Sequence, residues 1–262
     1  MVENRTTKDP TDYNVRAVER ALQIMECFDD EHPERGISDI AQAVGLHKAT
    51  AHRIVTTLVN YGYLERVEDG QKYRLGLELP NLGYKVLRRM DLRREAVPFM
   101  KQLVTEWDET CDLSIFDQGE VFYIEIVRGT RALTISAAVG QRLPVHATAS
   151  GKLFLAYLPE VQVSNILSQP MKAFTEKTVT SPEGIRAQLE EIRRQGYALD
   201  YEEFEHGVCA IAAPIFNRSG NIIAAIGGPS PMSRMTPERI QQIAEAFMEA
   251  AKGISHRMGY RS

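Results

Sequence analysis

The chain of 262 residues is 44% hydrophobic and 25% charged, a balance that is typical of folded globular proteins and excludes collagen-like, low-complexity and disordered chains. Its length favours two domains. The formal net charge of -4 argues against a strongly basic nucleic-acid coat protein, and the excess of acidic residues lies after residue 94.

No apolar run is long enough to cross a membrane, and the first ten residues have no apolar core typical of a signal peptide, so we expect a cytoplasmic protein. Residues 1–13 are expected to form a disordered tail. The three cysteines, Cys27, Cys111 and Cys209, are far apart and form no CxxC pair. We therefore expect reduced thiols, with neither a metal site nor a cofactor.

Three helices are predicted in the first sixty residues. A helix over residues 15–28 is indicated by apolar residues spaced three and four apart, namely Val18, Ala21, Leu22, Met25 and Phe28. Ser38 is the expected N-cap of a short second helix that ends at Gly45. Glycine fits the tight turn of a helix-turn-helix because it accepts left-handed backbone. A third helix is predicted over residues 48–61.

The third helix has two faces at 100° per residue. Its predicted core face consists of Ala51, Ile54, Val55, Leu58 and Tyr61. The opposite face is polar or small and consists of Ala49, Thr50, His52, Arg53, Thr56, Thr57 and Asn60. His47 and Lys48 precede it, and residues 45–64 contain no acidic residue, which suits contact with phosphate. Arg53 can bridge two guanine acceptors or bind a phosphate.

A short hairpin follows the third helix. Residues 65–67 and 72–75 are predicted strands around the turn Asp69-Gly70. Its basic residues, which we expect to contact phosphate, are Arg66, Lys72 and Arg74. The pattern predicts a winged helix-turn-helix that binds double-stranded DNA. The alternative is an ordinary three-helix bundle whose polar arc is a solvated face.

The remainder of the chain is predicted to be an α+β domain after a linker helix. Leu79, Leu82, Val86 and Met90 recur at helical spacing, with Pro80 in the first turn. Strands of one sheet are predicted over residues 113–116, 121–127, 133–137, 208–216 and 222–226. Helices are predicted over residues 95–109, 151–158, 181–195 and 236–258, with Gly196 as the C-cap of the third of these.

Several motifs resemble the IclR family of bacterial transcription regulators. They are residues 45–54 (GLHKATAHRI), 58–64 (LVNYGYL), 73–76 (YRLG), 143–152 (LPVHATASGK), 196–203 (GYALDYEE) and 210–217 (AIAAPIFN). They occur in the family's order and cover about residues 14–258. The resemblance implies a winged helix at residues 14–76, a linker helix at 77–94 and an effector-binding domain with a PAS- or GAF-like antiparallel sheet at 95–262.

A function follows from this resemblance. It implies a repressor or activator whose operator affinity changes when a small organic acid binds, and a homodimer or homotetramer. The competing hypothesis is a ligand-binding sensor or enzyme in which the helix-turn-helix mediates only protein contacts.

The effector is expected at the start of the helix near residue 151, where unpaired backbone amides and the helix dipole attract a carboxylate. The family resemblance places the effector in the same pocket, at positions occupied by Leu143, Ala149, Ser150, Gly151, Asp200, Val208 and Ala210. Asp200 could accept hydrogen bonds from ligand hydroxyls, which favours a hydroxylated or sugar-derived acid. Alternatively, Asp200 caps local backbone.

An enzyme is the alternative to these interpretations. His146, Cys209 and Asp200 could form a hydrolase triad on paper, but Cys209 lies in an alternating strand, which favours a packing role. No motif for metal, phosphate or nucleophilic catalysis occurs, so we expect no catalytic residue. A tight turn is predicted at residues 227–229, and Met232 and Met235 are expected to pack.

Overall fold

The computed structural model describes residues 14–67, 71–88, 91–131 and 138–261 of the chain. Packing divides the protein into two units, Met1–Val86 and Leu87–Ser262. The division falls within the linker predicted over residues 77–94. The predicted disordered tail, residues 1–13, lies outside the described residues.

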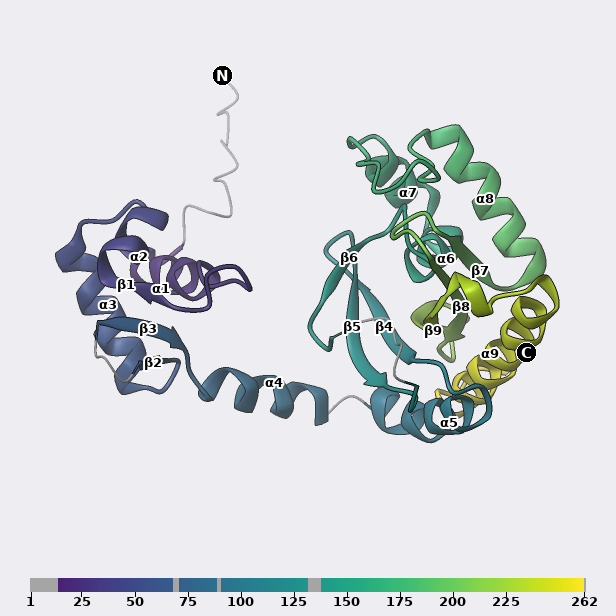
Figure 1. Cartoon of the computed structure of the whole chain (residues 1–262), viewed down its shortest axis with the longest axis horizontal. Helices are drawn as coiled ribbons and strands as arrows, with labels where there is room; N and C mark the ends of the chain where they lie inside the picture. Colours follow the sequence, from purple (N-terminus) through teal and green to yellow (C-terminus); the bar gives the residue numbers. More distant parts are fainter. Residues whose placement is uncertain (1–13, 68–70, 89–90, 132–137, 262) are drawn as a thin grey trace, which may run out of the picture. The chain divides into compact units, whose positions relative to one another are not determined.

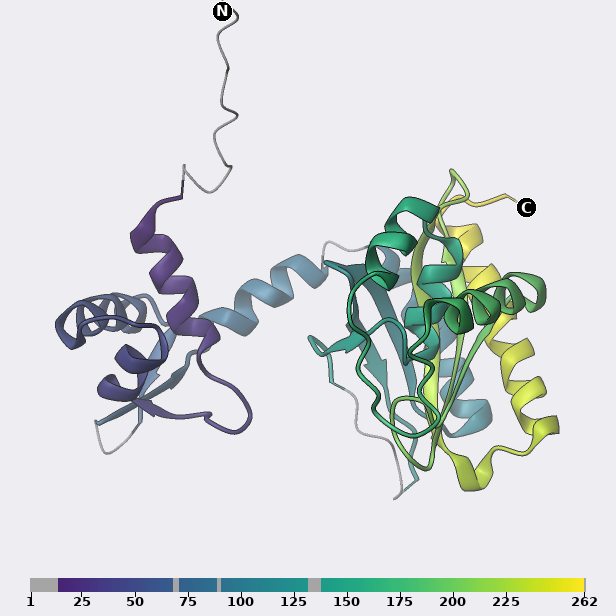
Figure 2. The ribbon, with the colours of Figure 1, turned by 90° about the horizontal axis from the view of Figure 1, so that it is seen from above.

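Before the linker helix, the described residues of the N-terminal unit form three helices and a small antiparallel sheet (Figure 1, Figure 2). The helices are α1 (Arg16–Glu26), α2 (Ile37–Ala43) and α3 (Lys48–Asn60), and the strands pair in the order β1 (Arg35–Gly36), β3 (Lys72–Leu75), β2 (Leu64–Arg66). The predicted helices and wing strands are confirmed. The predicted turn Asp69-Gly70 lies outside the described residues. Strand β1 was not predicted, since two residues are too few to show an alternating pattern.

Two local predictions in this unit, the N-cap of α2 and the position of Tyr61, were wrong. The helix α2 is capped at Gly36, not at Ser38, because Asp39 Oδ2 accepts the Gly36 N–H at 3.3 Å. Tyr61 is 70% exposed because α3 ends at Asn60 and Tyr61 leaves the helical arc. On α1, the buried residue is Ile24, whereas two of the apolar residues predicted on its stripe remain half-exposed, Val18 and Leu22. Gly45 has a φ of 64°, which confirms the turn between α2 and α3.

The linker helix α4 (Glu78–Arg88) has Pro80 in its first turn, as predicted. A new helix, α5 (Asp91–Trp107), begins four residues before the predicted start at residue 95. The side chains of Val86 and Met90, which were predicted on the linker's apolar stripe, lie outside the described part of the chain.

The C-terminal unit is built on an antiparallel sheet in the order β6-β5-β4-β9-β8-β7. Its strands are β4 (Cys111–Asp117), β5 (Glu120–Val127), β6 (Arg142–Pro144), β7 (Ala198–Tyr201), β8 (Val208–Phe216) and β9 (Ile222–Pro231). Four of the predicted strands are confirmed, and the fifth, over residues 133–137, lies outside the described residues. β9 continues through residues 227–229, so the tight turn predicted there was wrong.

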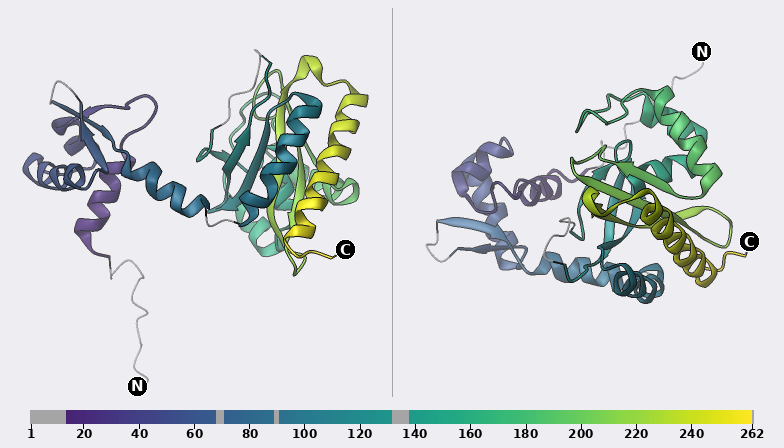
Figure 3. Two further views of the ribbon diagram at one scale, coloured as in Figure 1. Left: turned by 90° about the horizontal axis from the view of Figure 1, so that it is seen from below. Right: turned by 45° about the vertical axis from the view of Figure 1, so that its right-hand side comes forward.

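Helices cover both faces of this sheet. On one face α5 packs beside α9 (Pro237–Arg257), as Figure 3 shows, around a core that includes Met100, Ile211 and Phe247. Met232 and Met235 join this core, as predicted. The other face carries α6 (Ala149–Tyr157), α7 (Glu160–Leu167) and α8 (Pro182–Gln195) over a second core. Gly196, with a φ of 84°, ends α8 as predicted, whereas α7 was not predicted.

The α+β class is therefore confirmed. With both sheet faces covered, polar side chains in the covered stretches of β4, β8 and β9 are removed from water and need partners. No helix in the described ranges combines the length and apolarity that crossing a bilayer would require.

Candidate functional site

The outer face of α3 is polar and exposed. Ala51, Val55 and Leu58 are buried against the rest of the unit. The predicted DNA-contacting residues that stay exposed on or before this helix are His47, Lys48, Ala49, His52, Arg53 and Thr57, and Thr50 is half-buried. No acidic side chain occurs on this helix, so its exposed surface is neutral or positive and fits the phosphate-lined major groove.

The hydroxyl groups of Thr56 and Thr57 on this face are less available for contact with DNA. Thr57 Oγ1 donates to the Arg53 carbonyl at 3.0 Å, a bond to the preceding helical turn. The Thr56 hydroxyl oxygen is buried, which differs from the predicted outward position. The residues best placed to meet DNA are therefore on the first two turns of α3.

The wing carries the second group of predicted contacts. Arg66, Lys72 and Arg74 are all exposed. Arg74 Nε donates to Glu65 Oε1 at 2.5 Å across the β2–β3 pair, so this carboxylate offsets part of its charge. The Arg66 guanidinium lies 5.7 Å from the centre of the Tyr73 ring, which fixes its direction.

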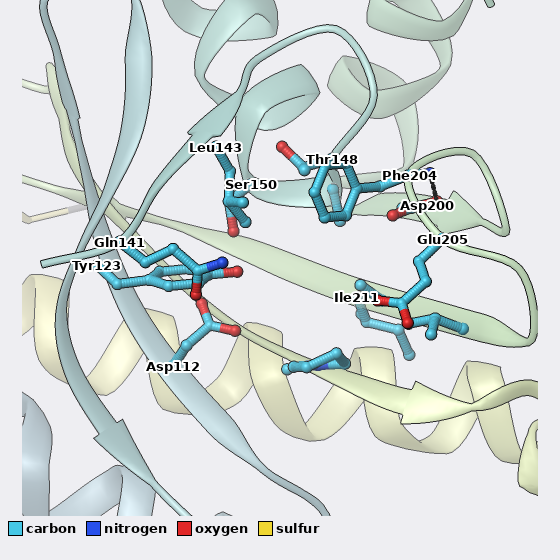
Figure 4. Close-up of a pocket in the computed structure, with 15 residues that line it drawn as sticks. Asp112, Tyr123, Gln141, Leu143, Thr148, Ser150, Asp200, Phe204, Glu205 and Ile211 are labelled. Atoms are coloured by element: carbon cyan, nitrogen blue, oxygen red, sulfur yellow. Dashed lines mark hydrogen bonds between the residues drawn. The ribbon is translucent and has the colours of Figure 1, made fainter. Parts of the chain in front are cut away.

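The C-terminal unit has a cavity between its sheet and the start of α6 (Figure 4). It contains about 540 Å³ not filled by protein atoms, including open space at its mouth. The residues of the predicted effector site that line it are Leu143, Ala149, Ser150, Asp200, Val208 and Ala210. Segments more than fifty residues apart in the sequence thus meet at one place.

The start of α6 forms one wall of the cavity. Thr148 is the N-cap, and its hydroxyl oxygen accepts the Gly151 N–H at 3.2 Å. The amides of Ala149 and Ser150 make no hydrogen bond within the described part of the chain. Ser150 points into the cavity. These two amides and the helix dipole can hold an anionic group.

Gly151, also predicted as an effector contact, does not line the cavity. A Cβ atom at this position would lie 2.3 Å from Val145 Cα and 2.4 Å from the Val145 carbonyl oxygen. Gly151 is therefore needed where α6 packs closely on the preceding loop, and its role is to place the helix start rather than to touch the ligand.

We expect Gly151→Ala to lower the free energy of unfolding by about 2–4 kcal/mol, because the backbone of Val145 cannot easily move away. Gly83→Ala on α4 is the matched control, since nothing lies within 4 Å of its Cβ position. It should be neutral or stabilising by up to about 1 kcal/mol. Urea unfolding followed by circular dichroism measures both changes, and equal stability of the two variants would contradict this role.

Asp200 is held by its own backbone. Its side chain is 3% exposed, and Oδ1 accepts the N–H groups of Glu203 at 2.7 Å and Phe204 at 3.3 Å. Burial raises the pKa of this carboxyl to about 6, while these hydrogen bonds oppose the rise. The capping interpretation of Asp200 is thus borne out for one oxygen, and the carboxyl still lines the cavity.

A second buried carboxyl, Asp112 on β4, lines the same cavity and was not predicted. Its side chain is 2% exposed, and burial raises its pKa to about 7. Tyr123 and Gln141 lie on its side of the cavity, whereas Asp200 and Glu205 lie on the other (Figure 4). The remaining lining residues missed by the sequence analysis are Thr148, Phe204, Ile211, Gly228 and Pro229.

Comparisons with known proteins agree for both units. Residues 17–68 match the family described as the IclR helix-turn-helix domain, and residues 84–256 match the family described as Bacterial transcriptional regulator IclR C-terminal. The chain belongs to the IclR family of transcriptional regulators. It is a DNA-binding transcription regulator and not an enzyme, as predicted from the sequence.

Relatives of this IclR-family regulator match over nearly its whole length. The HTH-type transcriptional regulator XynR of Escherichia coli (strain K12) is 36% identical over 94% of this chain and 98% of XynR. A transcriptional regulator from Rhodococcus sp. RHA1 has a similar structure, with a TM-score of 0.85 and 30% identity over 94% of this chain and 98% of that one. An IclR homolog from Microbacterium hydrocarbonoxydans, crystallised with 4-hydroxybenzoate, gives a TM-score of 0.82 and 33% identity over 92% and 98%.

The members of the hydrolase trio considered from the sequence make their described side-chain hydrogen bonds to other groups and not to one another. Burial raises the pKa of the Cys209 thiol to about 12, so the thiol stays protonated at neutral pH. His146 Nε2 lies 2.9 Å from the Lys172 carbonyl oxygen, to which it donates. No group of three or more His, Cys, Asp or Glu residues within the described ranges is placed to hold a metal ion.

Proposed function

We propose that a small organic acid, bound in the cavity at the start of α6, changes the affinity of this regulator for its operator. The cavity itself carries the proposal, because it joins two unpaired helix amides to an otherwise enclosed, partly apolar site. The relative crystallised with 4-hydroxybenzoate, a carboxylic acid with a distal hydroxyl, supports this class of effector. Residues 14–76 would bind DNA, 77–94 would link, and 95–262 would bind the effector.

Operator recognition is assigned to the exposed face of α3, and phosphate contact to the wing. The proposed α3 contacts are His47, Lys48, Ala49, Thr50, His52, Arg53 and Thr57, and the wing contacts are Arg66, Lys72 and Arg74. Base contacts from a helix in the major groove specify sequence, whereas wing contacts to phosphate add affinity without discrimination. Such a regulator would act in the cytoplasm, where its operator is.

We expect Arg53→Ala to weaken operator binding by about 1–3 kcal/mol and to reduce discrimination against altered operators. Lys72→Ala should weaken binding to all sequences alike and lower the salt dependence of the association constant by about one charge. Gel shifts at several salt concentrations, with operator and scrambled DNA, measure both. Normal operator binding by Arg53→Ala would show that α3 does not read the DNA.

Ser150→Leu should abolish the response to the effector, because the larger side chain fills the cavity at the α6 amides. Operator binding without effector should be unchanged, since the DNA-reading residues are in the other unit. Ser168→Leu, at an exposed serine after α7, is the control. A titration in which Ser150→Leu releases operator at the parent's effector concentration would place the effector elsewhere.

Self-association is also proposed, as a homodimer or homotetramer. Apolar residues remain at least 41% exposed at the N-cap of α1, on α1 and on α4, namely Val15, Val18, Leu22 and Leu82. One winged helix covers only a short half-site, so useful operator affinity needs two of them at a fixed spacing. Light scattering that gave a monomer at micromolar concentration, with and without DNA, would contradict this proposal.

A further inference from the structure

The cavity contains a buried hydrogen-bond acceptor that the protein itself does not use. Asp112 Oδ1 is shielded from water and makes no hydrogen bond with any described residue. Leaving such an oxygen without a partner costs free energy, because water would otherwise donate to it. An unpaired buried group that faces a cavity is explained when its partner comes from outside the protein.

Asp112 differs in this respect from the other buried carboxyl of the cavity. Asp200 Oδ1 already accepts two backbone N–H groups and serves the fold. The side chain of Asp112 has no hydrogen bond of this kind within the described part of the chain. Asp112 therefore brings a fully shielded and unpaired acceptor to the cavity, whereas one oxygen of Asp200 is already used by the fold.

The charges around the cavity restrict what can enter it. The carboxyl groups that line it are Asp112, Asp200 and Glu205, and no Lys, Arg or His is found among the described lining residues. A single carboxylate can use the unpaired amides of Ala149 and Ser150 at the start of α6. A second carboxylate on the same ligand would meet these carboxyl groups, with no described cation in the lining to offset the repulsion.

The two recognition elements lie on different walls. Ser150 marks the α6 wall, and Asp112 lies below it with Tyr123 on the sheet wall, beside Gln141, whereas Asp200 and Glu205 lie farther across the cavity (Figure 4). A ligand that satisfies both must carry a carboxylate at one end and a hydrogen-bond donor at the other. The hydroxyl of Tyr123 and the amide of Gln141 can assist the same distal group.

We propose that Asp112 is a specificity-determining residue of the effector site, which accepts a hydrogen bond from a hydroxyl or amino group distal to the effector's carboxylate. The effector class is therefore a donor-bearing monocarboxylic acid, and dicarboxylic acids of equal size are rejected. This inference rests on the proposed function of the cavity and deepens it.

Two series of acids matched in size provide the test. The aromatic series is benzoate, 4-hydroxybenzoate, 4-aminobenzoate and terephthalate, and the aliphatic series is hexanoate, gluconate and adipate. Calorimetric titration of the full chain should show that, in at least one series, a donor-bearing acid binds about tenfold tighter than the plain acid. The dicarboxylate should show no binding. The hydroxyl and amino members distinguish the two kinds of donor.

Variants connect this preference to Asp112. In Asp112→Leu, the preference for the donor-bearing acid over the plain acid should fall to less than about threefold. The variant should lose affinity for the donor-bearing acid, while the plain acid still binds. Asp112→Asn, which keeps an uncharged acceptor, should give an intermediate preference, since charge-assisted hydrogen bonds are about twice as strong as neutral ones. This conservative variant carries the test if Asp112→Leu does not fold. Asp117→Asn, at the half-exposed far end of the same strand and outside the cavity lining, should keep the parent's preference.

Operator release, measured in the same samples, distinguishes a failure of the role proposed for Asp112 from a failure of the proposed function of the cavity. If plain acids release operator equally well, or if Asp112→Leu and Asp112→Asn keep the full preference, the role of Asp112 is wrong while the proposed function stands. Equal binding of the dicarboxylate would also overturn it. If no acid of either series binds or releases operator, both the role of Asp112 and the proposed effector class fail.

Discussion

Lys152→Met is expected to lower the free energy of unfolding by about 3–5 kcal/mol, one of the two largest effects expected in this protein. Lys152 lies on α6, and its side chain is 2% exposed. It donates to Glu203 Oε1, and Glu203 is itself buried. Removing the ammonium leaves a buried carboxylate with Gln188 Nε2, at 3.4 Å, as its only side-chain donor among the described residues. Urea unfolding of the C-terminal unit measures the loss.

Two further variants test that the loss comes from an uncompensated charge. Lys177→Met breaks an ion pair with Glu202 at an exposed lysine of the same region, and should leave stability unchanged because water replaces the partner. Lys152→Met combined with Glu203→Met removes both buried charges and should be more stable than Lys152→Met alone. A double variant as unstable as the sum of its single variants would show that packing, not charge, explains the loss.

The ion pair also connects the two parts of the cavity. Lys152 follows the α6 start that offers its amides, and the Glu203 N–H donates to Asp200 Oδ1 at 2.7 Å. The Thr178 hydroxyl donates to the Glu203 carbonyl at 2.7 Å, which fixes the same loop from the outside. Loss of the pair should therefore weaken effector binding even in protein that remains folded.

The sequence could predict the DNA-binding unit more fully than the effector site. Helix α3 shows its faces directly, because Ala51, Val55 and Leu58 recur at helical spacing. By contrast, α1 could not be oriented from its pattern, since Val18 and Leu22 are apolar yet exposed. Periodicity shows that a helix has an apolar stripe, but not whether this chain or another molecule covers it.

The Lys152–Glu203 pair could not be predicted from spacing, because the partners are 51 residues apart. One signal was available. Lys152 is the charged residue in an otherwise apolar or small stretch, residues 149–156, and a helix that is apolar on all sides is buried. A lysine there must find an acidic partner, although its identity depends on the fold.

Asp112 was missed because the strand was predicted to begin at Leu113, two residues after its start at Cys111. Its position became informative only when helices were seen on both faces of the sheet, since they bury Asp112, whereas Asp117 at the far end of β4 stays half-exposed. The effector positions inferred from family resemblance, such as Leu143 and Ser150, came from motifs and not from geometry. The sheet brings them together with Asp112, which no motif marked.

Asp112→Asn should stabilise the protein by about 2–4 kcal/mol at pH 8, because the native state holds this carboxyl where its ionised form is unfavourable. Burial raises its pKa from 3.8 to about 7 in the folded protein. Between these values the native state binds more protons than the unfolded state, so this residue makes stability fall as pH rises from about 4 to 7. The buried neighbours Cys111 and Tyr123 stay neutral over this range, since burial raises their pKa values well above normal.

Thermal unfolding at a series of pH values therefore distinguishes the two buried acids. Asp112→Asn should flatten the decline up to pH 7, and its advantage over the parent should vanish below about pH 4. Asp200→Asn should act in the same direction over a narrower range that ends near pH 6, and with a smaller gain, because this carboxyl accepts two backbone N–H groups. The predicted sign would be wrong if the parent protein became more stable between pH 5 and pH 7 and Asp112→Asn removed this increase. A stabilised Asp112→Asn that also loses preference for donor-bearing acids would show that this carboxyl is retained for binding at the expense of stability.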